Sequence, residues 1–293
     1  MGKELKRIGA PFRQPEWSAL ALIDAPDLVL EAHESLIDAG AEVITTNAFA
    51  VVPFHIGDER FDTIGGDLVE VAAEVAREAA DEAERPVLVP GCLPSLFGSY
   101  QPELFDPERA PEIIDQFISR QAPFVDLWMA ETLSSLEEFD AVVEGLERHV
   151  ADEGDDLELW ASFTVADNLL GETATEAVLR SGESIGTLVE HVAGRCSSLL
   201  FNCSNPETID IAIGQLAEAL GPKPSIAFGA YANAIADVGE ILAKQGLHET
   251  RNELTPSVYA RHVAGWIEQG ATIVGGCCGI NPDHIAALVD LQS

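Results

Sequence analysis

Short runs of β-branched and other apolar residues alternate along the chain with longer segments whose apolar residues recur at helical spacing. The short runs predict seven strands, at residues 41–49, 86–92, 125–132, 157–165, 197–203, 224–231 and 271–277. The helical spacing predicts helices at residues 26–39, 63–83, 108–121, 134–149, 184–193, 206–220, 256–269 and 282–291. Apolar strands that alternate with helices are typical of a parallel sheet covered by helices, so we predict an α/β fold.

Two of the predicted helices begin with recognisable start signals. Ser134 precedes Glu137 at the spacing of a capping box, and Asn205 precedes Pro206, which then occupies the first helical position. These signals place two helix starts directly after predicted strands.

The length of 293 residues suits one (β/α)8 TIM barrel, for which about 250 residues is typical. A closed barrel needs eight strands, and residues 1–17 contain no strand-like run to supply the eighth. No Ser/Gly linker, repeat or low-complexity segment divides the chain. We therefore expect a single domain over residues 1–293, built as a (β/α)8 barrel that lacks its first strand.

The chain is strongly acidic, with 50 Asp and Glu against 16 Lys and Arg and a net charge of −34. A field of this sign repels phosphate backbones and anionic lipid, so nucleic-acid and membrane partners are not expected. The acidic residues are spread along stretches such as 81–84 and 152–156, which indicates a solvated surface adapted to a high-salt, halophilic cytoplasm. There is no signal peptide and no apolar run of 18 residues, which agrees with a cytoplasmic location. The oligomeric state stays open.

Three of the five cysteines stand where two predicted strands end. Cys203 follows one strand, and Cys277 with Cys278 follow another. An odd number of cysteines without a secretory signal favours reduced thiols, and clustered thiols favour metal binding or catalysis. Active sites of (β/α)8 barrels lie at the C-terminal ends of the strands. We therefore predict a catalytic zinc site with three thiolate ligands and a fourth position open to water or to a substrate thiol, which would be bound as thiolate. The glycines at 275, 276 and 279 would let the backbone turn so that both adjacent cysteines reach one ion.

Other interpretations of these residues stay open. Cys92 and Cys196 are expected to be buried core residues. A disulfide between Cys277 and Cys278 would be strained. A closed structural zinc site would need a fourth protein ligand such as His284. The remaining histidines, at positions 33, 55, 149, 191, 248 and 262, are expected in surface or packing roles.

Several polar residues also stand at predicted strand ends. Glu131 would anchor a substrate ammonium group, or it would be an acid at a helix start favoured by the helix dipole. Thr46, Asn47, Asn202 and Asn233 are candidates for lining a substrate pocket, and for some of them a role in forming turns is the alternative.

These residues resemble the homocysteine S-methyltransferases, a family that includes betaine-type enzymes and the homocysteine module of cobalamin-dependent methionine synthase. The similarity runs nearly end to end: MGKEL at 1–5, residues 39–49, Glu131-Thr132, Asn202-Cys203, GGCCG at 275–279 and Pro282 with His284 all resemble family motifs. The resemblance implies zinc held by Cys203, Cys277 and Cys278, the homocysteine sulfur as fourth ligand, and Glu131 near its amino group.

The chain departs from the family pattern in two places. The Asp-Gly that opens the family motif on the first strand has no counterpart, because this sequence begins at the Met that should follow it. We interpret this as a start assigned too far downstream rather than as a true loss. Residues 231–235 (YANAI) replace the usual P-N-[AS]-G turn, so the loop near the methyl donor should differ.

The leading hypothesis is methyl transfer to zinc-bound homocysteine from a small sulfonium or ammonium donor, which yields methionine. S-methylmethionine is the first choice of donor, ahead of S-adenosylmethionine, betaine or a corrinoid protein. The alternatives are methyl transfer to another small thiol, a zinc-dependent hydrolase, and a zinc- or thiol-binding protein without catalysis.

Overall fold

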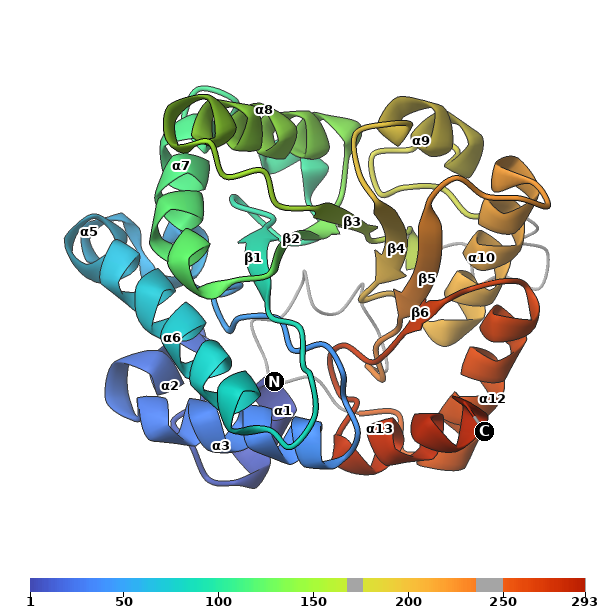
Figure 1. Cartoon of the computed structure of the whole chain (residues 1–293), viewed down its shortest axis with the longest axis horizontal. Coiled ribbons are helices and arrows are strands. Elements are labelled where there is room, and N and C mark those ends of the chain that lie inside the picture. The colour runs from blue at the N-terminus through green and yellow to red at the C-terminus, as the bar shows by residue number, and fades with distance from the viewer. Residues whose placement is uncertain (168–175, 236–249, 293) are drawn as a thin grey trace.

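A six-stranded parallel sheet lies at the centre of the computed structural model, which describes residues 1–167, 176–235 and 250–292. The strands follow one another in the sheet in chain order, from β1 to β6 (Figure 1). Their bounds are β1 Pro90–Pro94, β2 Leu127–Leu133, β3 Leu159–Phe163, β4 Ser198–Asn202, β5 Ala227–Tyr231 and β6 Ile273–Val274. The predicted α/β class with a parallel sheet is confirmed.

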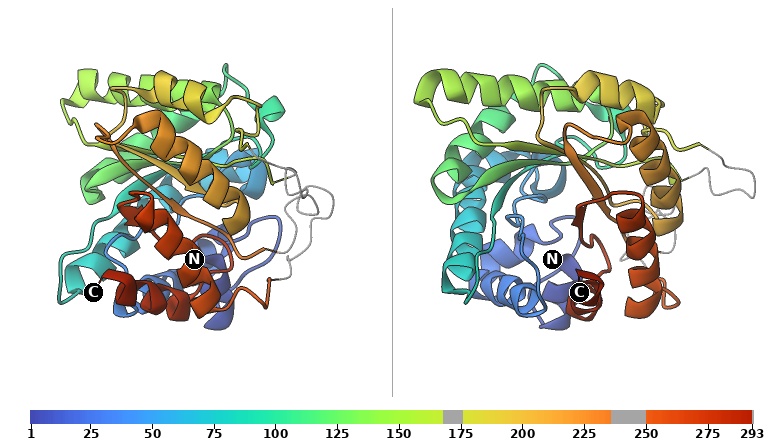
Figure 2. Two further views of the ribbon diagram at one scale, coloured as in Figure 1. Left: turned by 90° about the vertical axis from the view of Figure 1, so that its right-hand side faces the viewer. Right: turned by 45° about the vertical axis from the view of Figure 1, so that its right-hand side comes forward.

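The helices form a ring around the outside of the curved sheet (Figures 1 and 2). Their bounds are α1 Gly2–Arg7, α2 Ala19–Asp24, α3 Pro26–Asp38, α4 Pro53–Ile56, α5 Asp58–Arg60, α6 Gly66–Glu82, α7 Ala110–Gln121, α8 Leu136–Glu153, α9 Ile185–Val192, α10 Pro206–Leu220, α12 Pro256–Glu268 and α13 Pro282–Val289. A π-helical turn, Phe61–Gly65, precedes α6, and short 3-10 turns cover Pro102–Leu104, Ala122–Phe124 and Asp290–Gln292. The helices predicted near residues 26, 63, 108, 134, 184, 206, 256 and 282 are therefore present, with ends that differ by a few residues.

The predicted strand at 41–49 does not form a regular strand. This segment lies parallel to the residues that lead into β1, with one isolated bridge between Val43 and Leu88. Ile44 N donates to Leu88 O at 3.0 Å, and Leu88 N donates to the carbonyl of Glu42 at 2.9 Å. The next donor in such a parallel ladder would be the N–H of residue 90, and Pro90 has none. Thr46 N still donates to the carbonyl of Pro90 at 3.1 Å, so the ladder has a gap at Pro90 and no regular strand forms.

The sheet is open between β6 and the 43–46 segment. The described chain contains no strand that would join these two edges, so the sheet does not close into a barrel. Residues 1–17 contain helix α1 and an antiparallel bridge between Arg13 and Trp17. The expectation that this region supplies no strand of the sheet is confirmed.

The strand register brings the ends of neighbouring strands to one edge of the sheet. Pro94 pairs with Glu131 across β1 and β2, and Asn202 pairs with Tyr231 across β4 and β5. Residues that follow these positions therefore meet at the same C-terminal edge, where ligands bind in open α/β sheets.

Two predicted helix starts have different outcomes. The capping box of α8 is made by Ser135 and Glu138, one residue later than the predicted Ser134 and Glu137. The reason is that β2 continues to Leu133 and Ser134 still belongs to the turn. Helix α10 begins after Asn205 with Pro206 in its first turn, as predicted, although the Asn205 side chain makes no capping hydrogen bond.

The core lies between the sheet and the helices, where Trp128, Phe163 and Phe201 on the strands and Phe117 and Trp266 on the helices are fully buried. Burial of side chains of this size contributes about 1.5–3 kcal/mol each. The acidic stretches at 81–84 and 152–156 are largely exposed, as predicted from their charge. Within the described residues, no helix is both long and apolar enough to cross a membrane.

Candidate metal centre and substrate site

Cys203, Cys277 and Cys278 come together at the C-terminal edge of the sheet. Their three sulfur atoms lie within 4.8 Å of one another, and the sulfurs of Cys203 and Cys278 are 3.6 Å apart. The sequence places Cys203 74 residues before Cys277, so this convergence is a product of the fold. Cys203 is buried, Cys277 is partly exposed and Cys278 is exposed, so the cluster is reachable from outside.

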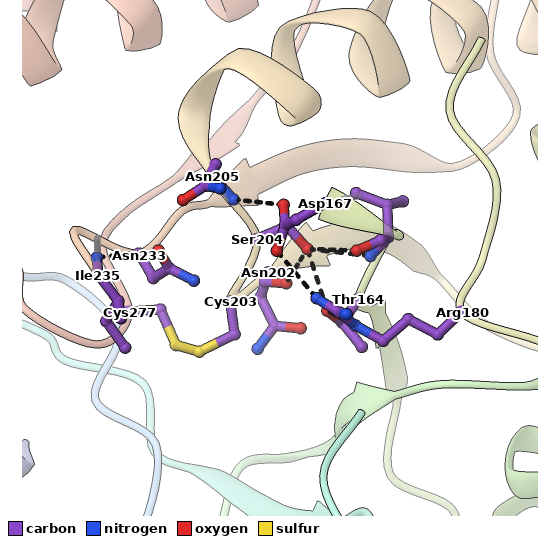
Figure 3. Close-up of polar contacts among 11 residues, drawn as sticks. Thr164, Asp167, Arg180, Asn202, Cys203, Ser204, Asn205, Asn233, Ile235 and Cys277 are labelled. Atoms are coloured by element: carbon purple, nitrogen blue, oxygen red, sulfur yellow. Dashed lines mark hydrogen bonds and ion pairs between the residues drawn. A yellow bond between two sulfur atoms is a disulfide. The ribbon is translucent and has the colours of Figure 1, made fainter. Parts of the chain in front are cut away.

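Cys203 and Cys277 are joined by a disulfide in the structure (Figure 3). The expectation that all cysteines are reduced was therefore wrong for this pair. It rested on the absence of a secretory signal, which gives no information on how near two thiols lie in the fold. Cys92, Cys196 and Cys278 are free.

The donor set fits a zinc ion once the disulfide is reduced. An ion with tetrahedral bonds of about 2.3 Å to sulfur needs sulfur–sulfur separations of about 3.8 Å. The sulfurs of Cys203 and Cys278 already lie at 3.6 Å, and the third sulfur is within 4.8 Å of both. Three soft thiolates with one side open to solvent are the ligands expected of a catalytic zinc site.

The continuation of β5 holds the two cysteine turns together. Cys203 N donates to the carbonyl of Tyr231 at 3.2 Å, and Cys277 N donates to the carbonyl of Ala232 at 2.9 Å. Ala234 N donates in turn to the carbonyl of Cys278 at 2.7 Å. Because one segment bonds to both turns, the spacing of the three sulfurs is fixed by the backbone.

The three glycines beside Cys277 and Cys278 were expected to let the backbone turn, but they differ in what they contribute. Of the three flanking glycines only Gly279 has a positive φ, +87°, whereas Gly276 is required for space because a Cβ there would lie 2.1 Å from the side chain of Ile280. Gly275 shows neither constraint. Cys203 itself takes a positive φ of 49°, which is uncommon for a residue with a side chain. Such local strain is held in place by surrounding structure and is concentrated at functional sites.

His284 does not join the cysteine cluster. Its Nδ1 lies 2.6 Å from Asn281 Oδ1 and its Nε2 lies 3.0 Å from the carbonyl of Leu254, so both ring nitrogens are engaged. The group of metal-binding side chains found among the described residues contains the three cysteines without a fourth protein ligand. This arrangement favours an open site over a closed structural one.

The other histidines lie away from the cluster's ligand set. His191 pairs with Asp140 and His262 with Asp210, both at 2.8 Å. His33 is buried, and burial lowers its pKa to about 3, while His55 and His149 pack against aromatic rings. These roles agree with the predicted surface and packing functions; His248 lies outside the described residues.

Glu131 lies near the end of β2, beside two neutral hydrogen-bond donors. Cys92 Sγ lies 3.4 Å from Glu131 Oε2, and Tyr231 Oη lies 3.3 Å from Glu131 Oε1. Burial raises the pKa of Glu131, and these two hydrogen bonds lower it in part. Burial lowers the pKa of the Met1 amino group, while the charges of Cys278 and Glu131 raise it, so an amino group already lies near both. Among the described residues no basic side chain is bonded to Glu131, and the ammonium group of a ligand would supply a cationic partner.

The four neutral candidates differ in how fully their polar atoms are used. Thr46 accepts from Cys92 N and donates to the side chain of Gln121, and Asn47 donates to the carbonyl of Ser18. Both amide atoms of Asn202 are engaged, with the hydroxyls of Ser162 and Thr132.

Asn233 is different from the other three candidates. Its Oδ1 accepts from Ile235 N at 3.1 Å, but its buried Nδ2 has no partner within residues 1–167, 176–235 and 250–292. Figure 3 shows this side chain beside the sulfurs of Cys203 and Cys277. An unpaired buried donor costs about 1–3 kcal/mol, so Asn233 is the neutral residue best prepared to bind a ligand.

The structure also reveals site residues that the sequence did not indicate. The hydroxyl of Tyr259 donates to the carbonyl of Gly275 at 2.6 Å and accepts from Ala232 N at 3.0 Å, so it joins the two segments that carry the cluster. Tyr231 contacts Glu131, and its place at a strand end was the one signal for that role. Arg180 and Asp167 form a further buried ion pair at this edge.

Comparison with known proteins agrees with this geometry. The homocysteine S-methyltransferase family matches residues 1–291. This chain belongs to the homocysteine S-methyltransferase family. A selenocysteine methyltransferase of Astragalus bisulcatus is 26% identical, over 100% of this chain and 90% of that protein, and the maize Homocysteine S-methyltransferase 1 is 26% identical over 97% and 90%.

Solved structures of a family member show the same fold. The metallated form of the Escherichia coli homocysteine methyltransferase MmuM superposes with a TM-score of 0.77 at 23% identity, covering 100% of this chain and 94% of that one. An oxidised form of the same protein superposes with a TM-score of 0.76 at 22% identity and the same coverage. The similarity extends over the whole of this chain.

Proposed function

We propose that this protein transfers a methyl group to the thiolate of homocysteine and so produces methionine. The observation that carries this proposal is the convergence of three cysteine sulfurs within 4.8 Å at the edge of the sheet that also carries Glu131. Family membership supports the same chemistry. The fold would be the family's (β/α)8 barrel, as one homocysteine-binding domain over the chain.

Zinc is the metal that this donor set fits, with Cys203, Cys277 and Cys278 as its protein ligands. When bound, zinc would hold a substrate thiol as thiolate at neutral pH, whereas a free thiol with a pKa near 8.5 is mostly protonated. The Cys203–Cys277 disulfide must first accept two electrons from a thiol reductant, which returns both sulfurs to the ligand form.

Glu131 would bind the ammonium group of homocysteine. The carboxylate is partly buried and its contacts are to a thiol and a phenol, so a substrate cation would be its strongest partner. The unpaired Nδ2 of Asn233 would donate to the substrate carboxylate. Thr46, Asn47 and Asn202 stay predicted substrate residues; their hydrogen bonds support an indirect role in holding the pocket wall.

The methyl donor would be a small sulfonium, with S-methylmethionine first and S-adenosylmethionine second. The homocysteine sulfur forms a new bond to the methyl carbon as the bond from that carbon to the donor sulfur breaks, and the leaving sulfide takes the electron pair. The donor's positive charge is lost in the step, and the thiol proton is released to solvent. Orientation of the two reactants supplies the protein's part of the rate enhancement.

The acidic surface supports a proposed setting in a high-salt cytoplasm. Its excess charge lies on exposed helical segments such as 81–84, where dissolved cations would screen the mutual repulsion.

The proposal is tested by assaying the reduced, zinc-loaded protein for methionine with homocysteine and a panel of donors: S-methylmethionine, S-adenosylmethionine and betaine. We expect turnover with at least one sulfonium donor and its loss in Cys277→Ala. Zinc binding without methionine from any donor would contradict the proposal and favour a zinc- or thiol-binding protein. Hydrolytic activity that persists without homocysteine would favour the zinc-dependent hydrolase.

A further inference from the structure

A cluster of polar side chains, formed by Arg180, Asp167, Thr164 and Tyr100, lies near Cys203 at the same edge of the sheet. Arg180 Nη2 bonds to Asp167 Oδ2 at 2.9 Å, and the two side chains are 11% and 8% exposed. Arg180 Nε donates to Thr164 Oγ1 at 3.1 Å. The guanidinium also lies over the ring of Tyr100, 4.4 Å from its centroid.

This cluster is tied to the turn that carries Cys203. Asn205 N donates to Asp167 Oδ1 at 2.9 Å, and the hydroxyls of Thr164 and Ser204 are 3.0 Å apart. Figure 3 shows Arg180 on one side of Cys203 and Asn233 with Cys277 on the other. The cysteines therefore lie between two polar regions, one with Asn233 and one with Arg180.

Tyr100 brings its ring to this position through an uncommon backbone conformation. Its φ is +69°, in the left-handed region that a bulky side chain rarely adopts. Burial raises the pKa of the Tyr100 phenol, the charges of Cys278 and Asp167 raise it further, and Arg180 opposes them. The phenol thus lies among the thiol cluster and the ion pair. An observed backbone outlier of this kind is a reason to look for a function.

Both residues keep hydrogen-bonding capacity that the described chain does not use. Arg180 has five N–H donors, and its hydrogen bonds to the described residues engage Nε and Nη2. No described residue is bonded to its Nη1 or to the hydroxyl of Tyr100. Donors that are already oriented and mostly desolvated form a site for a carboxylate.

We infer that Arg180 and Tyr100 form the subsite for the carboxylate of the methyl donor. This inference rests on the proposed methyl transfer. A sulfonium amino acid carries its positive charge at the reacting end and a carboxylate at the other. Thiolates attract the sulfonium end and Arg180 attracts the carboxylate end, so the two charges orient the methyl group toward the cysteine cluster. Asp167 holds the guanidinium in place and neutralises it in the absence of donor.

The test compares two donors that differ in one group: S-methylmethionine and its carboxylate-free analogue, (3-aminopropyl)dimethylsulfonium. Their binding to the reduced zinc protein is measured by calorimetry and their KM values by methionine formation. In Arg180→Met, we expect the Kd and KM for S-methylmethionine to rise roughly 10- to 100-fold. The values for the analogue and the KM for homocysteine should change less than about twofold. Tyr100→Phe should show the same selectivity with a smaller, severalfold effect.

Arg195→Met is the matched control. Arg195 also lies over an aromatic ring, that of Phe139 at 4.9 Å, and pairs with Asp140 at 2.6 Å, but it stands in the turn that follows the outer helix α9. Its loss should leave both donors unaffected. If Arg180→Met fails to fold because it strands the Asp167 charge, the double variant Asp167→Asn/Arg180→Met and Tyr100→Phe replace it.

An equal loss for both donors, or a loss confined to homocysteine, would overturn the inference, because it would show that Arg180 acts on the Cys203 turn. So would unchanged binding of S-methylmethionine, or no binding of it to the wild-type protein. If the wild type binds this donor in an Arg180-dependent manner and yet forms no methionine, the proposed function fails and the carboxylate subsite stands.

Discussion

Three cysteines at the edge of the sheet and two elsewhere, Cys92 and Cys196, show how position decides what a thiol does. Cys203, Cys277 and Cys278 stand on turns after strand ends, with their sulfurs within 4.8 Å of one another. Cys92 lies within β1, and Cys196 stands just before β4 with the carbonyl of Val192 at 3.9 Å from its sulfur.

Burial raises the pKa of the free thiols in both groups, Cys278 included, but at Cys278 the Met1 amino group and Lys3 act in the opposite direction. Burial raises the pKa of Cys92, and the neighbouring Glu131 raises it further. Burial also raises the pKa of Cys196, to about 11. Both thiols therefore stay protonated near neutral pH and are poor ligands and nucleophiles. A turn at the end of a strand, by contrast, allows several sulfurs to face one point in space.

The largest difference between the two groups should appear in catalysis. Cys203→Ala or Cys277→Ala removes a metal ligand, and without zinc the substrate thiol is mostly protonated. We expect turnover to fall by at least about 10²-fold, measured as methionine formation under reducing conditions. Cys196→Ala is the control, and equal losses in the two kinds of variant would refute the distinction.

Glu131→Gln tests the residue that is hydrogen-bonded to the buried Cys92 and lies at the edge of the sheet that carries the cysteine cluster. Loss of the charge should weaken homocysteine binding roughly 10- to 100-fold with unchanged zinc content, as measured by calorimetry. In the wild type, binding should fall as the pH is lowered and Glu131 takes up a proton. Because burial raises its pKa, this fall begins above the usual glutamate value, and the glutamine variant should lack it.

Glu131→Gln should weaken homocysteine binding but should not destabilise the folded protein. A carboxyl group whose pKa is raised on folding destabilises the folded state at neutral pH, where it must ionise. Glu131→Gln should therefore unfold at the same or a higher temperature than the wild type at pH 7. A lower unfolding temperature would show that Glu131 is needed for folding rather than for substrate binding.

Cys92→Ala should have a smaller effect on function. It removes the thiol that donates to Glu131, and a hydrogen bond of this kind is worth about 1 kcal/mol. We expect the KM for homocysteine to rise about threefold to tenfold while kcat and zinc content stay constant. A loss of zinc in this variant would place Cys92 among the metal residues.

Cys196→Ala should have the smallest effect. It removes one buried sulfur from the core, and we expect a loss of about 1 kcal/mol in the free energy of unfolding, measured with denaturant. Kinetic constants should be unchanged.

The sequence was sufficient to predict the alternation of elements and the three cysteines of the cluster. The local sequence shows that Cys203 and residues 277–278 each follow a strand. Because parallel strands place their C-terminal ends at one edge, these cysteines could be expected to meet. That residues 43–46 pair only briefly could not be predicted from their own sequence. The pairing is short because the neighbouring strand carries a proline at position 90.

Contacts between distant segments could not be predicted. The Cys203–Cys277 disulfide, the Tyr259 hydroxyl between two turns and the approach of Arg180 to Tyr100 all depend on how loops fold over the edge of the sheet. Neither periodicity nor spacing encodes these distances, and the left-handed backbone at Tyr100 and Cys203 occurs at residues whose identity does not favour it.

The central claim, that three specific thiolates hold one zinc ion, is tested most directly by the zinc stoichiometry of the reduced protein. Metal analysis should give one zinc per chain in the wild type and in a Cys92→Ala/Cys196→Ala double variant. It should give little or none in Cys203→Ala or Cys277→Ala. One zinc per chain retained after all three changes, at Cys203, Cys277 and Cys278, would contradict the account.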